Sequence, residues 1–282
     1  MKEGVFQIDI EKLLRSRTKM YVPRFLINYL KKIACQDGIN ECIATAEHPS
    51  GIHFFTDALK YLNITFEVLG RENMPDKEDR CVFASNHPLG GPEALIIGEL
   101  MRQEYGEAFR VPVNNILAAL KPLSEFFVPV NAISNKQSRN ISEGIASMFQ
   151  SPYQVLVYPA GKCSRLRKGL VSELPWKKMF ITQAKKYKRD VIPVHCSGIN
   201  SKRFYRLTLL SEKLGLKMNL GMLYLVDELF KHRNEKFVIT IGEKIPYTIF
   251  DKSKTDIQWA EYVREKVKNL GKNNNQPQNM GL

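Results

Sequence analysis

Hydrophobic positions in the first third of the chain recur at the spacing of helices. Charged residues stand between them, among them Arg24, Lys31 and Lys32. Residues three and four positions apart share one helix face, so this pattern predicts amphipathic helices, with a short one over residues 54–62. We therefore expect residues 1–72 to form an amphipathic helical segment. The apolar positions that carry this prediction are Phe25, Leu26, Tyr29, Leu30 and Ile33.

The pattern changes after residue 72, where short apolar runs alternate with helical periodicity. Strands are expected at residues 81–85, 110–113, 126–130, 154–158, 191–195 and 237–241. Helices are expected at residues 93–102, 115–120 and 138–149, and in a segment that Pro175 opens. Strands that alternate with helices indicate an α/β fold with a largely parallel sheet flanked by helices. We assign this domain to residues 73–250.

The C-terminal part of the chain predicts one more helix and a tail. Thr255 and Gln258 have the spacing of a capping box, which opens a helix within residues 251–271. Residues 272–282 are polar and are expected to be disordered.

Composition narrows the classes of partner. Lys and Arg total 42 against 29 Asp and Glu, a formal charge of +13. Such an excess favours a polyanionic partner, and nucleic acid, anionic lipid and acidic carrier proteins all qualify. No nucleic-acid module pattern is visible, however, and the basic residues are scattered. No apolar run of roughly 18 residues is present, so we expect no transmembrane helix and only a peripheral membrane role.

The cysteines and the N-terminal residues indicate the cellular compartment in which the protein is expected to work. The five cysteines are odd in number and form no C-x-x-C pair, which fits a reducing cytosol better than a disulfide framework or a zinc site. The N-terminal residues have no continuous apolar core, so no secretory signal is expected.

The most informative segment runs from Ser85 to Glu93 and reads SNHPLGGPE. A predicted strand ends at His87, a turn rich in Gly and Pro follows, and a helix begins near Glu93. Ligands of parallel sheets bind at the carboxyl ends of strands. A carboxylate on one imidazole nitrogen leaves the other nitrogen to accept a proton. This predicts His87 as a general base and Glu93 as its orienting partner. A plain strand-to-helix turn with an incidental His remains an equal alternative on this segment alone.

Four segments in order resemble the signature blocks of the glycerolipid acyltransferase family, which acylates lysophosphatidic acid and related lipids. The first is Asn86-His87 followed by a carboxylate, and residues 120–131 stand where the second belongs. Residues 158–165, YPAGKCSR, resemble the third block, F-P-E-G-T-R-S, and residues 191–194 resemble the fourth, an apolar strand with a central proline. The sequences HPLGG and PAGKCSR are similar to those of a bacterial hemolysin-like or lyso-ornithine-lipid acyltransferase subgroup.

The resemblance implies an O-acyltransferase that moves a fatty acyl chain from a thioester to a lyso-lipid hydroxyl. The expected co-substrate is an acyl carrier protein or coenzyme A thioester, with no cofactor, no metal and no nucleic acid. The expected place of work is an anionic membrane surface, peripherally on the cytoplasmic face. Backbone N–H groups near Gly161 are expected to hold the oxyanion. Residues expected to bind substrate are Asn86, Gly90, Gly91, Lys121, Asn131, Pro159, Gly161, Lys162, Ser164 and Arg165.

Departures from the family pattern point to the acceptor. Pro92 stands where the family has Asp, so the carboxylate of Glu93 comes one residue later. Ala160 stands where the third block has Glu, Cys163 stands at its Arg, and the second block lacks its usual Arg. In the family these blocks help to bind glycerol 3-phosphate. The departures favour a lyso-aminolipid of the ornithine or glycine type. The alternatives are a 1-acyl-glycerol-3-phosphate acyltransferase and a non-catalytic basic membrane-binding module.

Three further features leave two interpretations each. The basic cluster of Lys162, Arg165, Arg167 and Lys168 either holds the lipid head group or forms a solvated loop. Residues 174–178, LPWKK, suit either an interfacial anchor or a helix face packed on the sheet. His195 lies in an apolar strand, where a structural role is favoured over a catalytic one, and no nucleophilic role is expected for Cys163. A second enzyme class, the α/β-hydrolases, is disfavoured because no G-x-S-x-G motif is present.

Overall fold

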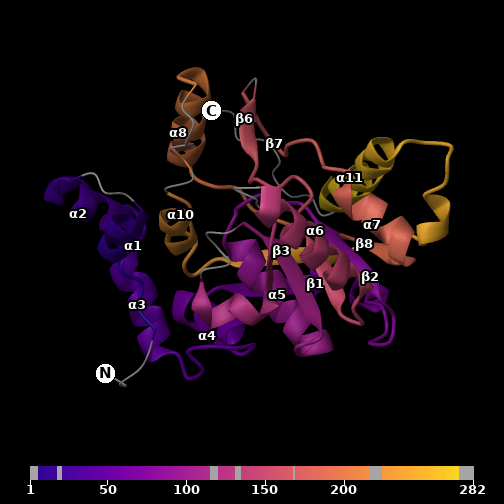
Figure 1. The fold of residues 1–282 in the computed structure, drawn as a ribbon, viewed down its shortest axis with the longest axis horizontal. Coiled ribbons are helices and arrows are strands. Elements are labelled where there is room, and N and C mark those ends of the chain that lie inside the picture. The colour runs from indigo at the N-terminus through magenta and orange to yellow at the C-terminus, as the bar shows by residue number, and fades with distance from the viewer. Residues whose placement is uncertain are drawn as a thin grey trace.

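A seven-stranded sheet forms the centre of the molecule in the described part of the chain (Figure 1). The computed structural model describes residues 6–17, 21–114, 120–130, 135–167, 169–215, 221 and 224–272. The strand order is β1-β9-β8-β2-β5-β3-β4. The strands are β1 (Thr65–Leu69), β2 (Cys81–Ser85), β3 (Phe109–Val113), β4 (Phe127–Pro129), β5 (Gln154–Val157), β8 (Asp190–Cys196) and β9 (Lys236–Ile241).

The sheet is largely parallel, as the sequence predicts. β8, β2, β5, β3 and β4 run in one direction, while β9 is antiparallel to β8 and carries β1 parallel to itself. The carboxyl ends of β8, β2 and β5 therefore meet at one edge of the sheet, and this edge positions the site described below.

Helices cover both faces of the central strands, which explains why those strands read as continuous apolar runs. Along β2, Phe83 packs with α4 (Phe54–Leu62) and α5 (Pro92–Tyr105). Val82 and Ala84 point to the other face, toward α6 (Asn135–Gln150), α7 (Met179–Tyr187) and α11 (Asp256–Lys272). Side chains alternate across a strand, so one short run supplies both cores.

The N-terminal helices lie along one side of the molecule (Figure 1). They are α1 (Ile10–Arg17), α2 (Arg24–Ile33) and α3 (Gln36–Thr45). α2 buries Ile27 and Ile33, whereas Phe25 is 76% exposed and Tyr29 is 46% exposed. The predicted helix is present, but three of the five apolar side chains that predicted it, Phe25, Leu26 and Tyr29, are exposed.

The helical prediction is wrong at Thr65–Leu69, which forms the edge strand β1 paired with β9. The segment reads TFEVL, a β-branched and aromatic run with strand-like alternation. It belongs to the sheet and not to the helical segment before it.

Most other predicted elements are present. The capping box is confirmed, because the Thr255 N–H donates to Gln258 Oε1 at 2.8 Å and the Gln258 N–H donates to Thr255 Oγ1 at 3.4 Å. α7 begins at Met179 instead of at Pro175, since the Lys177 N–H donates to the Pro159 carbonyl at 3.1 Å and so serves a turn. Residues 115–119 of one predicted helix and residues 273–282 of the predicted tail lie outside the described residues.

Several elements have no counterpart in the sequence prediction. β6 (Arg165–Arg167) and β7 (Leu170–Ser172) form an antiparallel hairpin, and α8 (Lys202–Lys213) stands beside it (Figure 1). α10 (Leu225–Lys231) precedes β9, and short 3-10 turns occur at η1 (Arg71–Asn73), η3 (Lys121–Phe126) and η4 (Tyr247–Ile249). None of the helices in the described ranges is long and apolar enough to cross a bilayer.

Candidate active site

The end of β2 is tied to the end of β8 by the side chain of Asn86. Its Oδ1 accepts the Cys196 N–H at 2.7 Å, and its Nδ2 donates to the Cys196 carbonyl at 2.9 Å. Both amide groups are thus engaged by one backbone position. Asn86 was expected to bind substrate, but in this structure it fixes the strand end from which His87 projects.

His87 and Glu93 come together across the turn that joins β2 to α5. His87 Nδ1 lies 2.9 Å from Glu93 Oε1, and the same oxygen accepts the N–H groups of Leu89 at 3.0 Å and Gly90 at 2.6 Å. Gly90 has φ +94, and a Cβ there would stand 2.4 Å from the Cys163 sulfur. The turn therefore requires glycine at this position. The expected proximity of the carboxylate and the imidazole is confirmed, while their catalytic roles stay predictions.

The environment keeps Glu93 ionised. Its side chain is fully buried, and burial by itself raises a carboxyl pKa, but contact with His87 and the Gly90 N–H lower the pKa of Glu93 below its usual value. The His87 side chain is 17% exposed. An anionic carboxylate at Nδ1 favours the tautomer with its proton there, which leaves Nε2 as the acceptor.

The third block packs directly on this pair. The Tyr158 ring lies against the imidazole with 4.6 Å between ring centroids, and the Ser164 N–H donates to the His87 carbonyl at 3.0 Å. Burial raises the pKa of Tyr158 well above 10, so the ring is neutral. Gly161 also stands here, after Pro159. Its N–H donates to the Tyr158 carbonyl at 2.9 Å and is thus engaged within this turn, while the expectation of oxyanion donors near Gly161 stays a prediction.

The predicted basic cluster is divided in space. Arg165 is 1% exposed, and its Nη1 donates to the Cys163 carbonyl at 2.9 Å, while its Nε lies 3.6 Å from Glu212 of α8. Lys162 and Arg167 are exposed, and Lys168 lies outside the described residues. In this conformation Arg165 joins the turn to α8 and does not face solvent.

The remaining predicted residues are more dispersed. Lys121 is exposed on η3, with its ammonium 5.3 Å from the centre of the Phe6 ring, and Asn131 lies outside the described residues. Gly91 precedes the first turn of α5. Cys163 is buried, which raises the pKa of its thiol to about 12 and agrees with its expected lack of a nucleophilic role.

Two residues near His87 were missed by sequence reasoning. The Glu173 carboxylate accepts the His87 N–H at 3.0 Å, and the buried Asn200 donates to the Leu89 carbonyl at 2.9 Å. Glu173 stands 86 positions from His87 in the chain, and Asn200 stands 111 positions from Leu89. No local pattern marks contacts over such separations.

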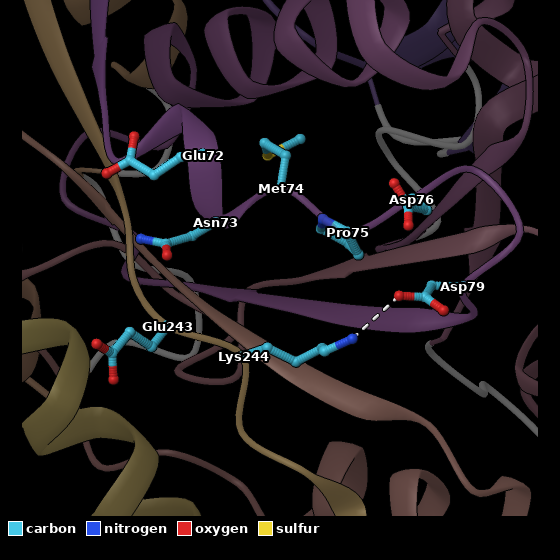
Figure 2. A pocket seen from close by; sticks show the side chains of 8 residues that line it. All are labelled: Glu72, Asn73, Met74, Pro75, Asp76, Asp79, Glu243 and Lys244. Carbon is cyan, nitrogen blue, oxygen red and sulfur yellow. Dashed lines mark hydrogen bonds and ion pairs between the residues drawn. The ribbon is translucent and has the colours of Figure 1, made fainter.

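An open hollow of about 370 Å³ lies at another place on the sheet (Figure 2). Asp79, two residues before β2, forms an ion pair with Lys244 at 3.1 Å across it. His87 follows the opposite end of β2, so this hollow is separate from the candidate site. Its lining residues are Glu72, Asn73, Met74, Pro75, Asp76, Asp79, Glu243 and Lys244.

Three residues that could ligate a metal ion lie close together where α3 is followed by α4, and one of them, Asp57, belongs to α4. The ligand atoms of Glu47, His48 and Asp57 are within 4.8 Å of one another, and the first two residues are exposed. Exposed acidic groups of this kind are common without an ion, and none of the three is part of the His87 site.

Comparison with known proteins identifies the family. The sequence profile of the family described as acyltransferase matches residues 12–276. A lyso-glycine lipid O-acyltransferase of Bacteroides thetaiotaomicron is 41% identical over 271 residues, covering 95% of this chain and 99% of that protein. A lyso-glycine lipid O-acyltransferase of Phocaeicola vulgatus is 38% identical, covering 95% and 96%.

A solved structure of the 1-acyl-sn-glycerophosphate (LPA) acyltransferase PlsC from Thermotoga maritima is also similar. It has a TM-score of 0.49 and 17% identity, and the match covers 94% of this chain and 89% of that chain. The profile match and the two relatives show that this chain is an enzyme that belongs to the acyltransferase family.

Proposed function

We propose that this enzyme transfers a fatty acyl chain from an acyl thioester to the hydroxyl of a lyso-aminolipid of the glycine-lipid type. Two relatives with this named activity, at 41% and 38% identity over 95% of the chain, support the acceptor class. The observation that carries the chemistry is the fully buried Glu93 carboxylate, 2.9 Å from His87 Nδ1 at the carboxyl end of β2.

The proposed reaction is a direct transfer. His87 Nε2 accepts the proton of the acceptor hydroxyl as its oxygen attacks the thioester carbonyl. The tetrahedral intermediate then collapses, the carbon–sulfur bond breaks, and the proton passes from the imidazolium to the departing thiolate. Glu93 stabilises the imidazolium, and the Tyr158 ring holds the plane of the imidazole.

The test is His87→Ala, with His53→Ala as the matched control because His53 is exposed and carries no motif. Removal of a general base lowers turnover by about 100- to 10,000-fold. We expect His87→Ala to show that loss with a circular dichroism spectrum like that of the wild type, and His53→Ala to retain turnover. Near-normal transfer by a folded His87→Ala variant would reject the mechanism.

The proposed donor is an acyl carrier protein, with coenzyme A thioester as the alternative. The charge of +13 favours an acidic protein partner, because opposite charge raises the rate of encounter. With one acyl chain on both carriers, we expect a higher kcat/KM for the carrier protein that falls as salt rises. A higher kcat/KM for the coenzyme A thioester at every salt concentration would favour coenzyme A.

The proposed place of work is the cytoplasmic face of an anionic membrane, bound peripherally. α2 supports this, because Phe25 and Tyr29 are exposed on a helix that also carries Arg24, Lys31 and Lys32. Aromatic rings beside basic residues suit the boundary between lipid head groups and acyl chains. The five cysteines, all free among the described residues, agree with a reducing compartment.

A further inference from the structure

The main chain of His87 is held on both sides by one distant segment. Its N–H donates to Glu173 Oε1 at 3.0 Å, and its carbonyl accepts the Ser164 N–H at 3.0 Å. Ser164 precedes the β6–β7 hairpin and Glu173 follows it. The hairpin therefore closes on the catalytic strand end through these two hydrogen bonds.

Glu173 is a carboxyl group that loses its hydration on burial, although the N–H group it serves needs only one acceptor. Burial raises the pKa of the Glu173 carboxyl to about 7, an effect that is partly offset by Trp176, by the His87 N–H and by the charges of Arg264 and His87. A neutral amide side chain would accept the same hydrogen bond without that desolvation cost. With its pKa raised to about 7, the Glu173 side chain acts here through its acceptor oxygen, which ties the end of the β6–β7 hairpin to His87.

His87 thus has two carboxyl side chains as partners. Glu93 lies at Nδ1 of its ring, and Glu173 accepts the N–H of its main chain. Because the main chain sets the direction in which a side chain leaves it, a hydrogen bond at this N–H also fixes where the imidazole points.

We propose that Glu173 is a positioning residue: its side-chain oxygen fixes the main chain of His87 and so holds the imidazole in place for proton transfer. This inference rests on the proposed role of His87 as general base. Glu173 does not contact the substrate in this scheme and acts through His87 alone.

The experiment separates the oxygen of Glu173 from its charge. Glu173→Gln keeps an acceptor oxygen without the charge, and Glu173→Ala removes both. Glu243→Gln is the matched control, because Glu243 is exposed at the hollow near the other end of β2. The readouts on the purified full chain are kcat, KM for the acceptor, and the pH profile of kcat/KM, with thermal unfolding as a folding check.

Each variant has a distinct expected result. Glu173→Ala lowers kcat by about 10- to 100-fold with little change in KM, as loss of residues that orient a reacting group does. Glu173→Gln recovers most of kcat and keeps the wild-type pH profile, because its amide oxygen accepts the same hydrogen bond. Glu243→Gln behaves as the wild type.

Two outcomes would overturn the inference. Unchanged kcat in Glu173→Ala removes the positioning role, and a Glu173→Gln variant as slow as Glu173→Ala shows that the acceptor oxygen does not carry it. If Glu173→Ala does not fold, Glu173→Met takes its place, because it keeps the length of the side chain without an acceptor oxygen. His87→Ala distinguishes the failures: an active His87→Ala rejects the general base itself, whereas an inactive one beside wild-type Glu173 variants rejects only this inference.

Discussion

One carboxylate oxygen of Glu93 contacts both the main chain of the turn and the imidazole of His87. Oε1 closes the turn through the Leu89 and Gly90 N–H groups and also lies 2.9 Å from His87 Nδ1. The family pattern would place Asp at position 92, where this chain has Pro92. The structure puts Pro92 at the first position of α5, and the longer side chain of Glu93 reaches the imidazole from the next residue.

Substitution at Glu93 separates charge from reach. Glu93→Gln keeps the length of the side chain but removes the charge that stabilises the imidazolium, so we expect kcat to fall by about 100-fold or more. Glu93→Asp keeps the charge but loses one methylene, so its oxygen no longer reaches the Gly90 N–H without movement of the turn. We expect Asp to lower the thermal stability more than Gln does. Full activity in Glu93→Gln would show that the carboxylate is no part of a dyad.

The sequence predicts the local half of the site and misses the distant half. His87 and Glu93 are six positions apart on a strand-to-helix turn, where spacing alone places them together. Glu173 reaches His87 across 86 positions, so its place depends on how the hairpin folds over the strand end. Arg165 is the converse case. Its basic neighbours suggest a ligand site, but α8 covers it, and α8 was not predicted from the sequence.

At the scale of elements, the strands that are buried on both faces are the ones that the sequence predicts well. β2, β5 and β8 are covered on both faces and therefore read as apolar runs that any strand pattern detects. β1 is the edge strand, and its run TFEVL has a strand-like alternation that the prediction did not use; only its pairing with β9, near the other end of the chain, has no local signal. The β6–β7 hairpin has strands of three residues each, which are too short to carry a clear periodic signal.

The packing of α11 on β8 makes the fold sensitive to acid. His195 lies against Gly271, where a Cβ would stand 2.4 Å from Nε2, and burial lowers the pKa of His195 to about 4. The unfolded chain protonates His195 below about pH 6.5, whereas the folded protein resists protonation until about pH 4. The contribution of the neutral imidazole to stability is therefore full above pH 6.5 and is lost as pH falls toward 4. We expect the wild type to lose about 2 kcal/mol more than His195→Leu between pH 7 and pH 4.5. Urea unfolding at both pH values measures it, and equal losses would contradict it.

α2 is expected to place the enzyme on the membrane. Tyr21, just before it, is 84% exposed and Phe25 is 76% exposed, so replacing both by Ala removes apolar area without disturbing the core. We expect binding to anionic vesicles to weaken several-fold and also to fall as salt rises.

Turnover of a short-chain, water-soluble acceptor should not change in this double variant. Ile257→Ala is the control, since Ile257 is 49% exposed on α11. If the double variant and the control bind vesicles equally well, α2 is not the membrane contact. Equal binding to neutral and anionic vesicles at all salt concentrations would remove the electrostatic part.

At the scale of the molecule, the candidate site and the surface by which a substrate would reach it lie at the same end of the sheet. The β6–β7 hairpin follows the carboxyl end of β5, and α8 follows that of β8, so both flank the strand end that carries His87 (Figure 1). They expose Leu170, Leu210 and Leu214. An amphiphilic acceptor needs such a surface, where its chain meets apolar side chains while its hydroxyl reaches the imidazole.

The charges at this end bear on the head group of the acceptor. The buried Ala160 stands where the family has Glu, and Arg165 is turned toward Glu212, so the exposed cations of the cluster in the described part of the chain are Lys162 and Arg167. Two flexible exposed cations suit a single carboxylate, while a phosphate dianion gains more from a fixed Arg fork.

We therefore expect a lyso-aminolipid to be preferred over lysophosphatidic acid when both compete for one acyl thioester, by about tenfold, a difference of about 1.4 kcal/mol. Arg167→Ala should raise KM for the acceptor and leave KM for the donor unchanged, because a head-group contact acts on one substrate only. Arg165→Ala is the comparison. If Arg165 turns outward to bind the head group, Arg165→Ala raises KM for the acceptor more than Arg167→Ala does. An effect of either variant on the donor alone would assign the basic cluster to the acyl carrier. A clear preference for lysophosphatidic acid would reject the proposed acceptor and leave the acyltransferase chemistry of His87 in place.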